Sequence, residues 1–289
     1  MKDLKYYLEK AQKEKFAIPQ FNFSDYSQLK VIAELSAKLQ APVIIGTSEG
    51  ESQFFGLEEA VALRDVLRKK LNAPIFLNLD HGKSLEYLKQ AADAGYDMIH
   101  FDGSKLPLEE NIKISKEVVK YGRKKRIIVE GEIGRLGTDA SRLYTEKFEI
   151  KEENLTKPEE AVRYLKETGV NLLTVSIGNF HGIDASGQDP NLRLDLLKKI
   201  QEAVGDNVGL VLHGGSGVPA GDIRQSIQLG IVKININTES RVAYSGALRK
   251  FLTENPQEVV PYKFLVSAKE AMAKVVQEKI NLFGNVGKA

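Results

Sequence analysis

The stretch LVLHGGSG at residues 210–217 places a histidine between an apolar run and a glycine-rich turn. An apolar run bounded by a turn is typical of a buried strand, so His213 is expected at the carboxyl end of that strand. The glycines leave backbone amides uncovered and Ser216 adds a hydroxyl, so this turn could hold an anion such as phosphate. A buried histidine before an ordinary turn would give the same pattern, and the stretch alone leaves both interpretations open.

The rest of the chain repeats this plan of an apolar run followed by a helical pattern. Besides the opening stretch, strands are predicted over residues 16–23, 42–47, 74–82, 97–103, 126–133, 171–178 and 230–235. Helices are predicted over 2–14, 24–39, 57–70, 84–95, 107–125, 156–169, 193–204, around 223–227, 238–254 and 267–283. The expected caps are Ser24-Asp25, Ser84 and Thr238, with capping boxes at Thr156/Glu159 and Ser267/Glu270.

Regular alternation of strands and helices implies an α/β fold with a parallel sheet. Eight such units within 289 residues fit a closed (β/α)8 TIM barrel, with a short N-terminal helix and a C-terminal helical extension. We therefore expect a single domain over residues 1–289, with its active site at the carboxyl ends of the strands. A doubly wound open sheet is the alternative, but no Gly-x-Gly-x-x-Gly motif follows the first strand.

The composition excludes several classes of partner. Basic and acidic residues number 41 and 39, giving a net charge of +2, so no binding to nucleic acid or to an anionic membrane is expected. The basic run at 123–126 follows a predicted helix, where cations complement the helix dipole. The chain has no cysteine, so a transition-metal site would need histidine and carboxylate ligands. There is no stretch of membrane-spanning length and no apolar signal core, and a cytoplasmic location is expected.

Three of the four histidines, His81, His181 and His213, fall at predicted carboxyl ends of strands, and each precedes a glycine. In a barrel all three would face one opening, and three histidines with an open fourth position are the ligands of a catalytic zinc. Each histidine alone would more often be an ordinary core or surface residue. His100 lies inside a strand, beside Phe101, and is expected to be structural.

Carboxylates gather at the same end of the predicted barrel. Asp80 precedes His81, and Asp102 ends the next strand. Glu130 and Glu132 share one face of their strand, and a buried face would require a metal or hydrogen-bond partner for both. An ordinary surface or capping role stays open for Glu130.

Polar residues of the eighth strand lie at this end too. Asn235 and Asn237 share a strand face, and Thr238 opens a helix whose amino end would face the same opening. The loops after the seventh and eighth strands are a frequent phosphate site of this fold. Helix capping alone would also explain Thr238.

Taken together, these motifs resemble the class II (zinc-dependent) ketose-bisphosphate aldolases of the fructose-1,6-bisphosphate and tagatose-1,6-bisphosphate type. The resemblance spans nearly the whole chain. Its ordered motifs are Phe21-Asn22, Thr47-Ser48-Glu49-Gly50, Leu79-Asp80-His81-Gly82, Phe101-Asp102-Gly103-Ser104, Glu130-Gly131-Glu132-Ile133-Gly134, Ile177-Gly178-Asn179-Phe180-His181-Gly182, and residues 212–217 and 233–241.

The resemblance implies one Zn²⁺ ion per subunit. His81, His181 and His213 would bind it. Glu132 and Asp102 would support the metal site or would serve as ligands of an alternate metal position. The zinc would polarise the ketone of dihydroxyacetone phosphate and stabilise the enediolate.

The resemblance also assigns residues to the substrate. Asp80 would exchange a proton with the C4 hydroxyl derived from the aldehyde, and Asn235 would bind near the enediolate. The residues implied for the dihydroxyacetone-phosphate end are Gly182, Gly214, Ser216, Asn237 and Thr238. Ser48 and Arg241 would take the far phosphate, with Arg241 reaching from a neighbouring subunit, and Asn22 would contact the substrate as well. A monovalent cation (Na⁺ or K⁺) and a homodimer or homotetramer are also implied.

The chain departs from the family pattern in two places. The family usually carries a glutamate on the loop after the fifth strand, as a candidate for proton transfer at the nucleophilic carbon. Here Ala140 stands at that position, with Asp139 as the nearest substitute and Glu146 further along. Fructose-bisphosphate enzymes often have aspartate where Asn237 stands, so Asn237 does not settle which sugar is cleaved.

The sequence therefore predicts a zinc aldolase that reversibly cleaves a ketose 1,6-bisphosphate. Fructose 1,6-bisphosphate is the first choice, and tagatose 1,6-bisphosphate or another phosphorylated ketose is the second. A non-catalytic sugar-phosphate-binding protein on the same scaffold is the rival hypothesis. The altered loop after the fifth strand favours that rival, and the intact Asp80 argues against it.

Overall fold

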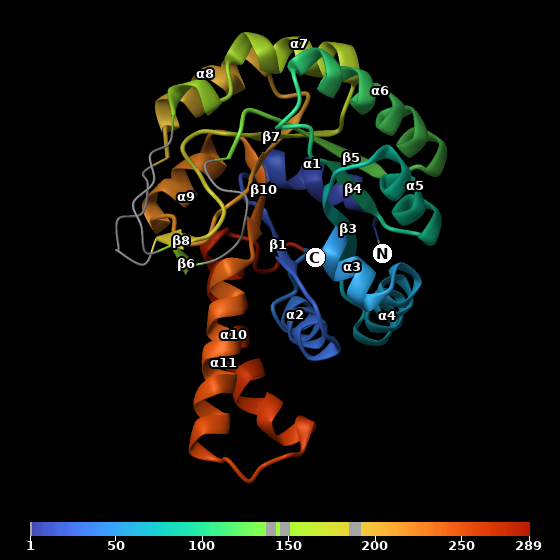
Figure 1. The fold of residues 1–289 in the computed structure, drawn as a ribbon. Helices are drawn as coiled ribbons and strands as arrows, with labels where there is room; N and C mark the ends of the chain where they lie inside the picture. Colours follow the sequence, from blue (N-terminus) through green and yellow to red (C-terminus); the bar gives the residue numbers. More distant parts are fainter. Residues whose placement is uncertain (1, 137–142, 145–150, 185–191) are drawn as a thin grey trace.

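The computed structural model describes residues 2–136, 143–144, 151–184 and 192–289, and its central feature is a closed barrel of parallel strands (Figure 1). Each barrel strand pairs with the next barrel strand along the chain, and β1 closes the ring against β10. The barrel strands are β1 (Ile18–Asn22), β2 (Val43–Ser48), β3 (Ile75–Gly82), β4 (Met98–Phe101), β5 (Ile128–Ile133), β7 (Leu172–Val175), β9 (Gly209–Leu212) and β10 (Ile231–Ile236). The predicted (β/α)8 fold is confirmed, and the open-sheet alternative is wrong.

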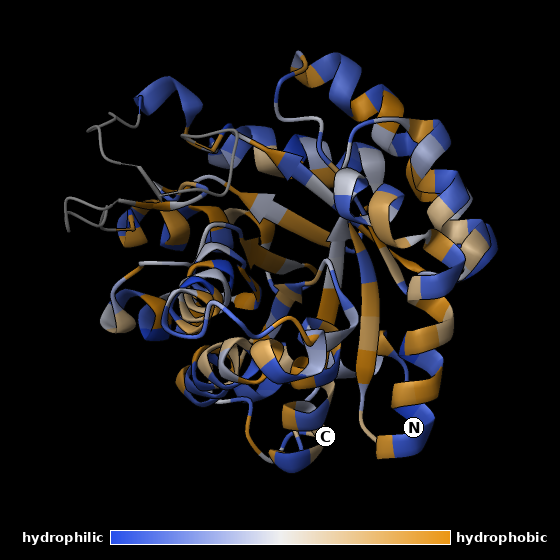
Figure 2. Cartoon of the chain, turned by 60° about the horizontal axis from the view of Figure 1, so that its bottom comes forward, coloured by the Kyte–Doolittle hydropathy of each residue, from blue (hydrophilic) through white to orange (hydrophobic). Residues whose placement is uncertain are grey.

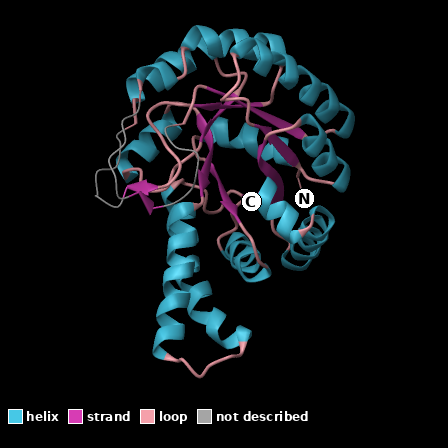
Figure 3. Cartoon of the chain, viewed as in Figure 1, coloured by secondary structure: helices cyan, strands magenta, loops and turns pink. Residues whose placement is uncertain are grey.

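Helices surround the barrel and connect its strands (Figure 3). They are α1 (Leu4–Glu14), α2 (Tyr26–Lys38), α3 (Glu49–Phe55), α4 (Leu57–Leu71), α5 (Leu85–Ala94), α6 (Leu108–Lys125), α7 (Pro158–Thr168), α8 (Leu194–Val204), α9 (Ala220–Gln228), α10 (Thr238–Glu254) and α11 (Pro261–Leu282), with the 3₁₀ turn η1 (Glu152–Asn154). The pair α10 and α11 projects beyond the ring formed by the other helices (Figure 1). Within the described part of the chain, no helix is long and apolar enough to cross a membrane.

The core has two layers because strand residues alternate between the two faces of the barrel wall. Outward-facing residues pack against the helices, and Figure 2 shows the strands as largely hydrophobic. Inward-facing residues near the amino ends of the strands pack against α1. This inner cluster contains Ile18, Ile44, Phe76, Met98, Ile128, Leu172, Val211 and Val232, with Leu4, Tyr7, Leu8 and Ala11 of α1. The helix α1 therefore covers the amino end of the barrel.

Two of the predicted helix caps are confirmed. The Asp25 side chain accepts the Gln28 amide, and Ser84 accepts the Tyr87 amide. Both capping-box predictions are wrong, because α7 and α11 begin at Pro158 and Pro261. Proline is favoured in the first turn of a helix, where its missing N–H needs no partner.

The residues predicted as caps have other roles. The Thr156 hydroxyl donates to the Ile133 carbonyl and accepts the Ser176 amide, so it joins the ends of β5 and β7. Ser267 lies inside α11. Thr238 is the first residue of α10 rather than its cap, and the preceding Asn237 makes no side-chain capping bond.

The helix α3 and the strands β6 and β8 were not predicted from the sequence. Ser48 ends β2 and caps α3 directly, in a capping box with Glu51. The strands β6 (Leu143–Tyr144) and β8 (Ile183–Asp184) form a separate two-stranded sheet from the segments that follow β5 and β7. These elements therefore belong to the connections that leave the carboxyl end of the barrel.

Candidate active site

The barrel interior becomes polar toward the carboxyl ends of the strands, since each strand contributes every second residue. Directly above the apolar cluster lies a fully buried layer. Its members are Gln20, Asn78, His100, Glu130, Thr174 and Lys233. Two residues further along the strands come Asn22, Asp80, Asp102, Glu132 and Asn235. The predicted inward face of Glu130 and Glu132 is confirmed, and a surface role for Glu130 is wrong.

Asp80 and His81 are consecutive, yet both side chains take part in the same cluster. The register of β3 against β4 shifts between Leu79 and Gly82, and His81 has a φ of 53°. An irregularity of this kind redirects a side chain that would otherwise point to the opposite face. The end of β3 therefore presents a carboxylate and an imidazole side by side.

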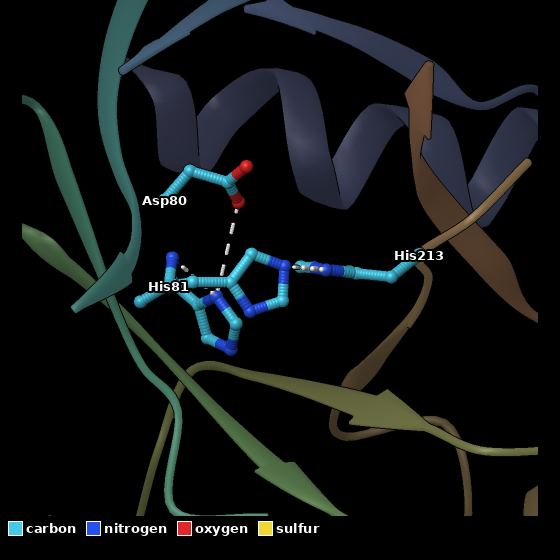
Figure 4. A group of neighbouring side chains, drawn as sticks. Asp80, His81 and His213 are labelled. Atoms are coloured by element: carbon cyan, nitrogen blue, oxygen red, sulfur yellow. Dashed lines mark hydrogen bonds and ion pairs between the residues drawn. The ribbon is translucent and has the colours of Figure 1, made fainter. Parts of the chain in front are cut away.

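His81 and His213 come from different strands and face each other (Figure 4). His81 Nε2 lies 3.0 Å from His213 Nδ1. The other nitrogen of each ring meets a carboxylate: His81 Nδ1 lies 2.9 Å from Asp102 Oδ2, and His213 Nε2 lies 2.7 Å from Glu130 Oε1. Carboxylates placed behind imidazoles in this way orient metal-binding histidines and leave the inner nitrogen as the ligand.

The His181 ring joins this pair from the segment after β7. Its centre lies 4.7 Å from the ring centre of His81 and 6.1 Å from that of His213. Two nitrogens bound to one tetrahedral zinc at ~2.0 Å are about 3.3 Å apart, and the His81–His213 pair has nearly this separation. Asp80, His81, His100 and His213 form a group whose ligand atoms lie within 4.8 Å of one another and could hold a metal ion, and the His181 ring lies beside this group.

The two other predicted metal residues lie beside this set. Asp102 stands behind His81, as described above. Glu132 is buried, with Oε2 at 3.8 Å from His81 Nδ1 and 3.2 Å from His100 Nε2. Asp102 thus supports a histidine, and His81, Asp102 and Glu132 form a second group whose ligand atoms are close enough to hold a metal ion.

Asp80 is held between two amides. Its Oδ2 accepts from Asn22 Nδ2 and its Oδ1 accepts from Asn235 Nδ2, each at 3.0 Å. Burial opposes ionisation of this carboxyl, but the charge of His81 and the nearby His100 outweigh it and hold the pKa of Asp80 well below its ordinary value. Asp80 is therefore a fixed carboxylate beside a metal-ligand candidate.

The two facing histidines titrate differently. Burial lowers the pKa of His213 to about 3, which keeps the ring in the neutral form that binds metals. Burial also acts to lower the pKa of His81, but Asp80 and the hydrogen bond to Asp102 outweigh it and raise that pKa. Protons should therefore compete with a metal mainly at His81.

A cavity of about 540 Å³ opens next to these groups. Its wall includes His81, His181, Ser48, Asn237 and Arg241, so residues predicted for the metal and for the substrate meet in one space. The resemblance implied that Arg241 reaches in from a neighbouring subunit. The structure places Arg241 in the wall of its own chain's cavity, where it pairs with Glu51, and a contribution of this residue to a neighbouring subunit stays a prediction.

The turn at 214–217 has the features expected of an anion site. Gly214 has a φ of 62°, and a Cβ atom there would lie 2.0 Å from the Phe180 carbonyl oxygen, so only glycine fits. The amides of Gly215 and Gly217 donate to Asn235 O and to Glu239 Oε1. Among the bonds of the described residues, none uses the amides of Gly214 and Ser216, as expected for a turn that could hold an anion.

The other residues predicted for the phosphate adjoin this turn. Gly182 directly follows His181 and has a φ of 117°. The Ser216 hydroxyl accepts the amide of Glu239 in the first turn of α10, next to the buried Thr238. The amino end of α10 thus abuts the 214–217 turn.

Sequence reasoning missed Lys233 and the part played by His100. Lys233 Nζ lies 2.9 Å from Glu130 Oε2 and donates to Asn235 Oδ1 at 2.7 Å. The two-residue spacing of Lys233 and Asn235 could have indicated that both point inward. His100 Nδ1 accepts the His81 amide at 3.1 Å, so it supports the irregular backbone at His81. The predicted proton-transfer residue Asp139 lies outside the described residues, as do Ala140 and Glu146.

A parallel (β/α)8 barrel with three convergent imidazoles beside a buried carboxylate is the arrangement of a metal-dependent barrel enzyme. Residues 2–288 match the family model for fructose-bisphosphate aldolase class-II. The chain belongs to this class II aldolase family, and it is a lyase.

Solved structures agree with this assignment. The YdjI aldolase of Escherichia coli K12 is 30% identical over 100% of this chain and 99% of its own, with a TM-score of 0.81. A chain from Coccidioides immitis is 27% identical over 98% of this chain and 96% of its own, with a TM-score of 0.82. The fructose-bisphosphate aldolase (Fba) of Campylobacter jejuni shares the fold at 22% identity, with a TM-score of 0.82 over 99% of this chain and 95% of its own.

Proposed function

We propose that this chain is a zinc-dependent aldolase that reversibly cleaves a ketose 1,6-bisphosphate, with fructose 1,6-bisphosphate preferred. The products would be dihydroxyacetone phosphate and glyceraldehyde 3-phosphate. One observation carries the proposal: the inner nitrogens of His81 and His213 face each other with carboxylates behind both rings, and Asp80 is adjacent. Such a site can bind a metal and move a proton in the same step.

His81, His181 and His213 would hold the zinc, which as a Lewis acid would polarise the substrate ketone. Asp80 is ionised and fixed by Asn22 and Asn235, so it can accept the proton of the C4 hydroxyl when the C3–C4 bond breaks. In the reverse direction Asp80 returns that proton to the aldehyde oxygen. The two amides keep its carboxylate in one orientation throughout.

The phosphate of the dihydroxyacetone half would bind at the 214–217 turn. The amides of Gly214 and Ser216 and the amino end of α10, which abuts this turn, would supply the donors. Gly182, Asn237 and Thr238 lie next to this turn or line the cavity and would complete the site. This arrangement would place the substrate ketone near the three histidines.

Tagatose 1,6-bisphosphate or another phosphorylated ketose is the second candidate, and Asn237 in the cavity wall is compatible with either sugar. We also propose that the chain acts in the cytoplasm as a homodimer or homotetramer. The exposed apolar side chains of Val259 and Tyr262, by the connection of α10 to α11, support self-association.

The experiment measures zinc content and the cleavage of fructose 1,6-bisphosphate and tagatose 1,6-bisphosphate by the purified chain. We expect one zinc per chain and turnover that His213→Ala abolishes together with the metal. A His213→Ala variant that keeps its activity would refute the metal site. Zinc-loaded protein that binds both sugars without cleaving either would instead support the non-catalytic rival.

A further inference from the structure

A buried carboxylate contacts the residues predicted to bind the far phosphate. Glu51 lies on α3 and is only 8% exposed. Ser48 and Arg241 are the residues predicted to bind the far phosphate, and Asn22 is predicted to contact the substrate. In the structure all of them donate to Glu51 instead.

The contacts use both oxygens of Glu51. Its Oε2 accepts the Ser48 amide at 2.9 Å, the Ser48 hydroxyl at 2.9 Å and Asn22 Nδ2 at 3.1 Å. Its Oε1 accepts the Ser24 hydroxyl and forms an ion pair with Arg241 Nη2. Glu51 thus provides, from within the protein, the kind of anion that these donors would otherwise bind.

This arrangement changes the charge of the subsite. Arg241 paired with Glu51 contributes no net charge, so an incoming phosphate would meet a carboxylate that already holds its donors. A phosphate dianion would have to displace Glu51 and would be repelled by it, because like charges at short range disfavour each other. A sugar hydroxyl has no charge and can bind beside the pair without displacing it.

The role of Glu51 inferred next presupposes the proposed aldolase function. We propose that Glu51 is a specificity-determining residue that neutralises Arg241, so the enzyme accepts ketose 1-phosphates, which end in a hydroxyl, nearly as well as ketose 1,6-bisphosphates. Both reactions break the C3–C4 bond and release dihydroxyacetone phosphate. They differ only in whether the glyceraldehyde product carries a phosphate.

The test compares kcat/KM for fructose 1,6-bisphosphate and fructose 1-phosphate in the zinc-loaded enzyme. The variant is Glu51→Gln. Glutamine removes the negative charge but can still accept the Ser48 amide in the capping box. Thermal unfolding checks that this variant is folded. The matched control is Glu58→Gln, which removes an exposed carboxylate from the neighbouring α4.

We expect the wild-type enzyme to favour the bisphosphate by less than about tenfold. Glu51→Gln should raise that ratio at least tenfold, and adding Arg241→Met should remove the gain. Glu58→Gln should leave the ratio unchanged.

A strong wild-type preference for the bisphosphate that Glu51→Gln does not alter would overturn the proposal. The far phosphate would then displace Glu51 or bind other cations of the cavity wall, such as Lys83 or Arg135. If Glu51→Gln does not fold, two other measurements test the proposal. They are the ratio of kcat/KM for the two sugars in the wild-type enzyme and the same ratio in Arg241→Met. The proposal predicts that Arg241→Met changes this ratio less than tenfold. Failure of the wild-type enzyme to cleave either sugar would refute the aldolase function itself.

Discussion

Replacement of Glu130 by glutamine should separate two roles of one buried carboxylate. Glu130 Oε1 meets His213 Nε2 at 2.7 Å, and Oε2 pairs with Lys233 Nζ at 2.9 Å. Glutamine keeps the shape and one acceptor oxygen but removes the charge. Lys233 is fully buried, and a buried charge that loses its partner costs about 3–5 kcal/mol.

The loss of stability can be converted into a change of the thermal midpoint, because the conversion depends on the length of the chain. A loss of 1 kcal/mol lowers the thermal midpoint of a large domain by about 2–4 °C, so Glu130→Gln should lower it by about 6–20 °C. Zinc affinity should fall by about 10–100-fold, because the carboxylate behind His213 is gone. The double variant Glu130→Gln/Lys233→Met removes the whole ion pair and should recover most of the stability, but it should not recover the zinc affinity.

The assay is thermal unfolding of the metal-free protein, together with zinc titration against a competing chelator. Glu117→Gln is the control, because it removes an exposed carboxylate on α6. An unchanged thermal midpoint in Glu130→Gln would show that Lys233 does not depend on this partner. Recovery of zinc affinity in the double variant would refute a direct action of Glu130 on His213.

Three further predictions concern the metal and the anion site. Asp102→Asn should weaken zinc binding by about 10–100-fold, because it removes the negative charge next to His81 Nδ1. An unchanged zinc affinity in competition with a chelator would contradict the supporting role of Asp102. Zinc affinity should rise with pH by up to about tenfold per unit, because His81 must lose its proton to bind the metal. Asp80 and Asp102 raise the pKa of His81, so the rise should level off only above the ordinary histidine pKa of 6.5. A zinc affinity that stays constant between pH 5.5 and 8.5 would contradict this prediction. Gly214→Ala should lower the affinity for dihydroxyacetone phosphate at least about tenfold. The added Cβ atom would clash with the Phe180 carbonyl oxygen, so the backbone of the turn would have to move. Unaltered binding in calorimetry would show that this turn does not hold the phosphate.

The barrel could be predicted because its evidence is periodic and spread over the whole chain. Eight apolar runs alternating with helical patterns allow few topologies, and the closed order of strands confirms the prediction. The histidines at strand ends followed from the same reasoning, since one end of a barrel gathers residues that are distant in sequence. The structure indeed brings His81, His181 and His213 together.

Local details were harder to predict, because one residue often satisfies more than one pattern. Thr156 fits a capping box, yet Pro158 begins the helix and the hydroxyl joins two strand ends. Simple alternation along β3 would place Asp80 and His81 on opposite faces, and only the irregular register with a positive φ at His81 brings both into the site. Such irregularities depend on neighbouring strands, which the sequence of one strand does not contain.

Buried polar partners were the least predictable part of the site. Lys233 on β10 and Glu130 on β5 are more than 100 residues apart by their numbers, and only the closed barrel makes them neighbours. The same holds for Glu51 and Arg241, which come from α3 and α10. A charged residue in a strand predicts that a partner exists, but it does not identify the partner.

The most direct test of the account concerns Asp80, whose proposed role is confined to the proton of the C4 hydroxyl. The measurement compares Asp80→Asn with the wild-type enzyme for zinc content, for exchange of the dihydroxyacetone-phosphate C3 proton with solvent, and for cleavage of fructose 1,6-bisphosphate. We expect Asp80→Asn to keep its zinc and still to exchange the C3 proton, while cleavage falls by about 100-fold or more. Cleavage at the wild-type rate by the zinc-loaded variant would contradict the account.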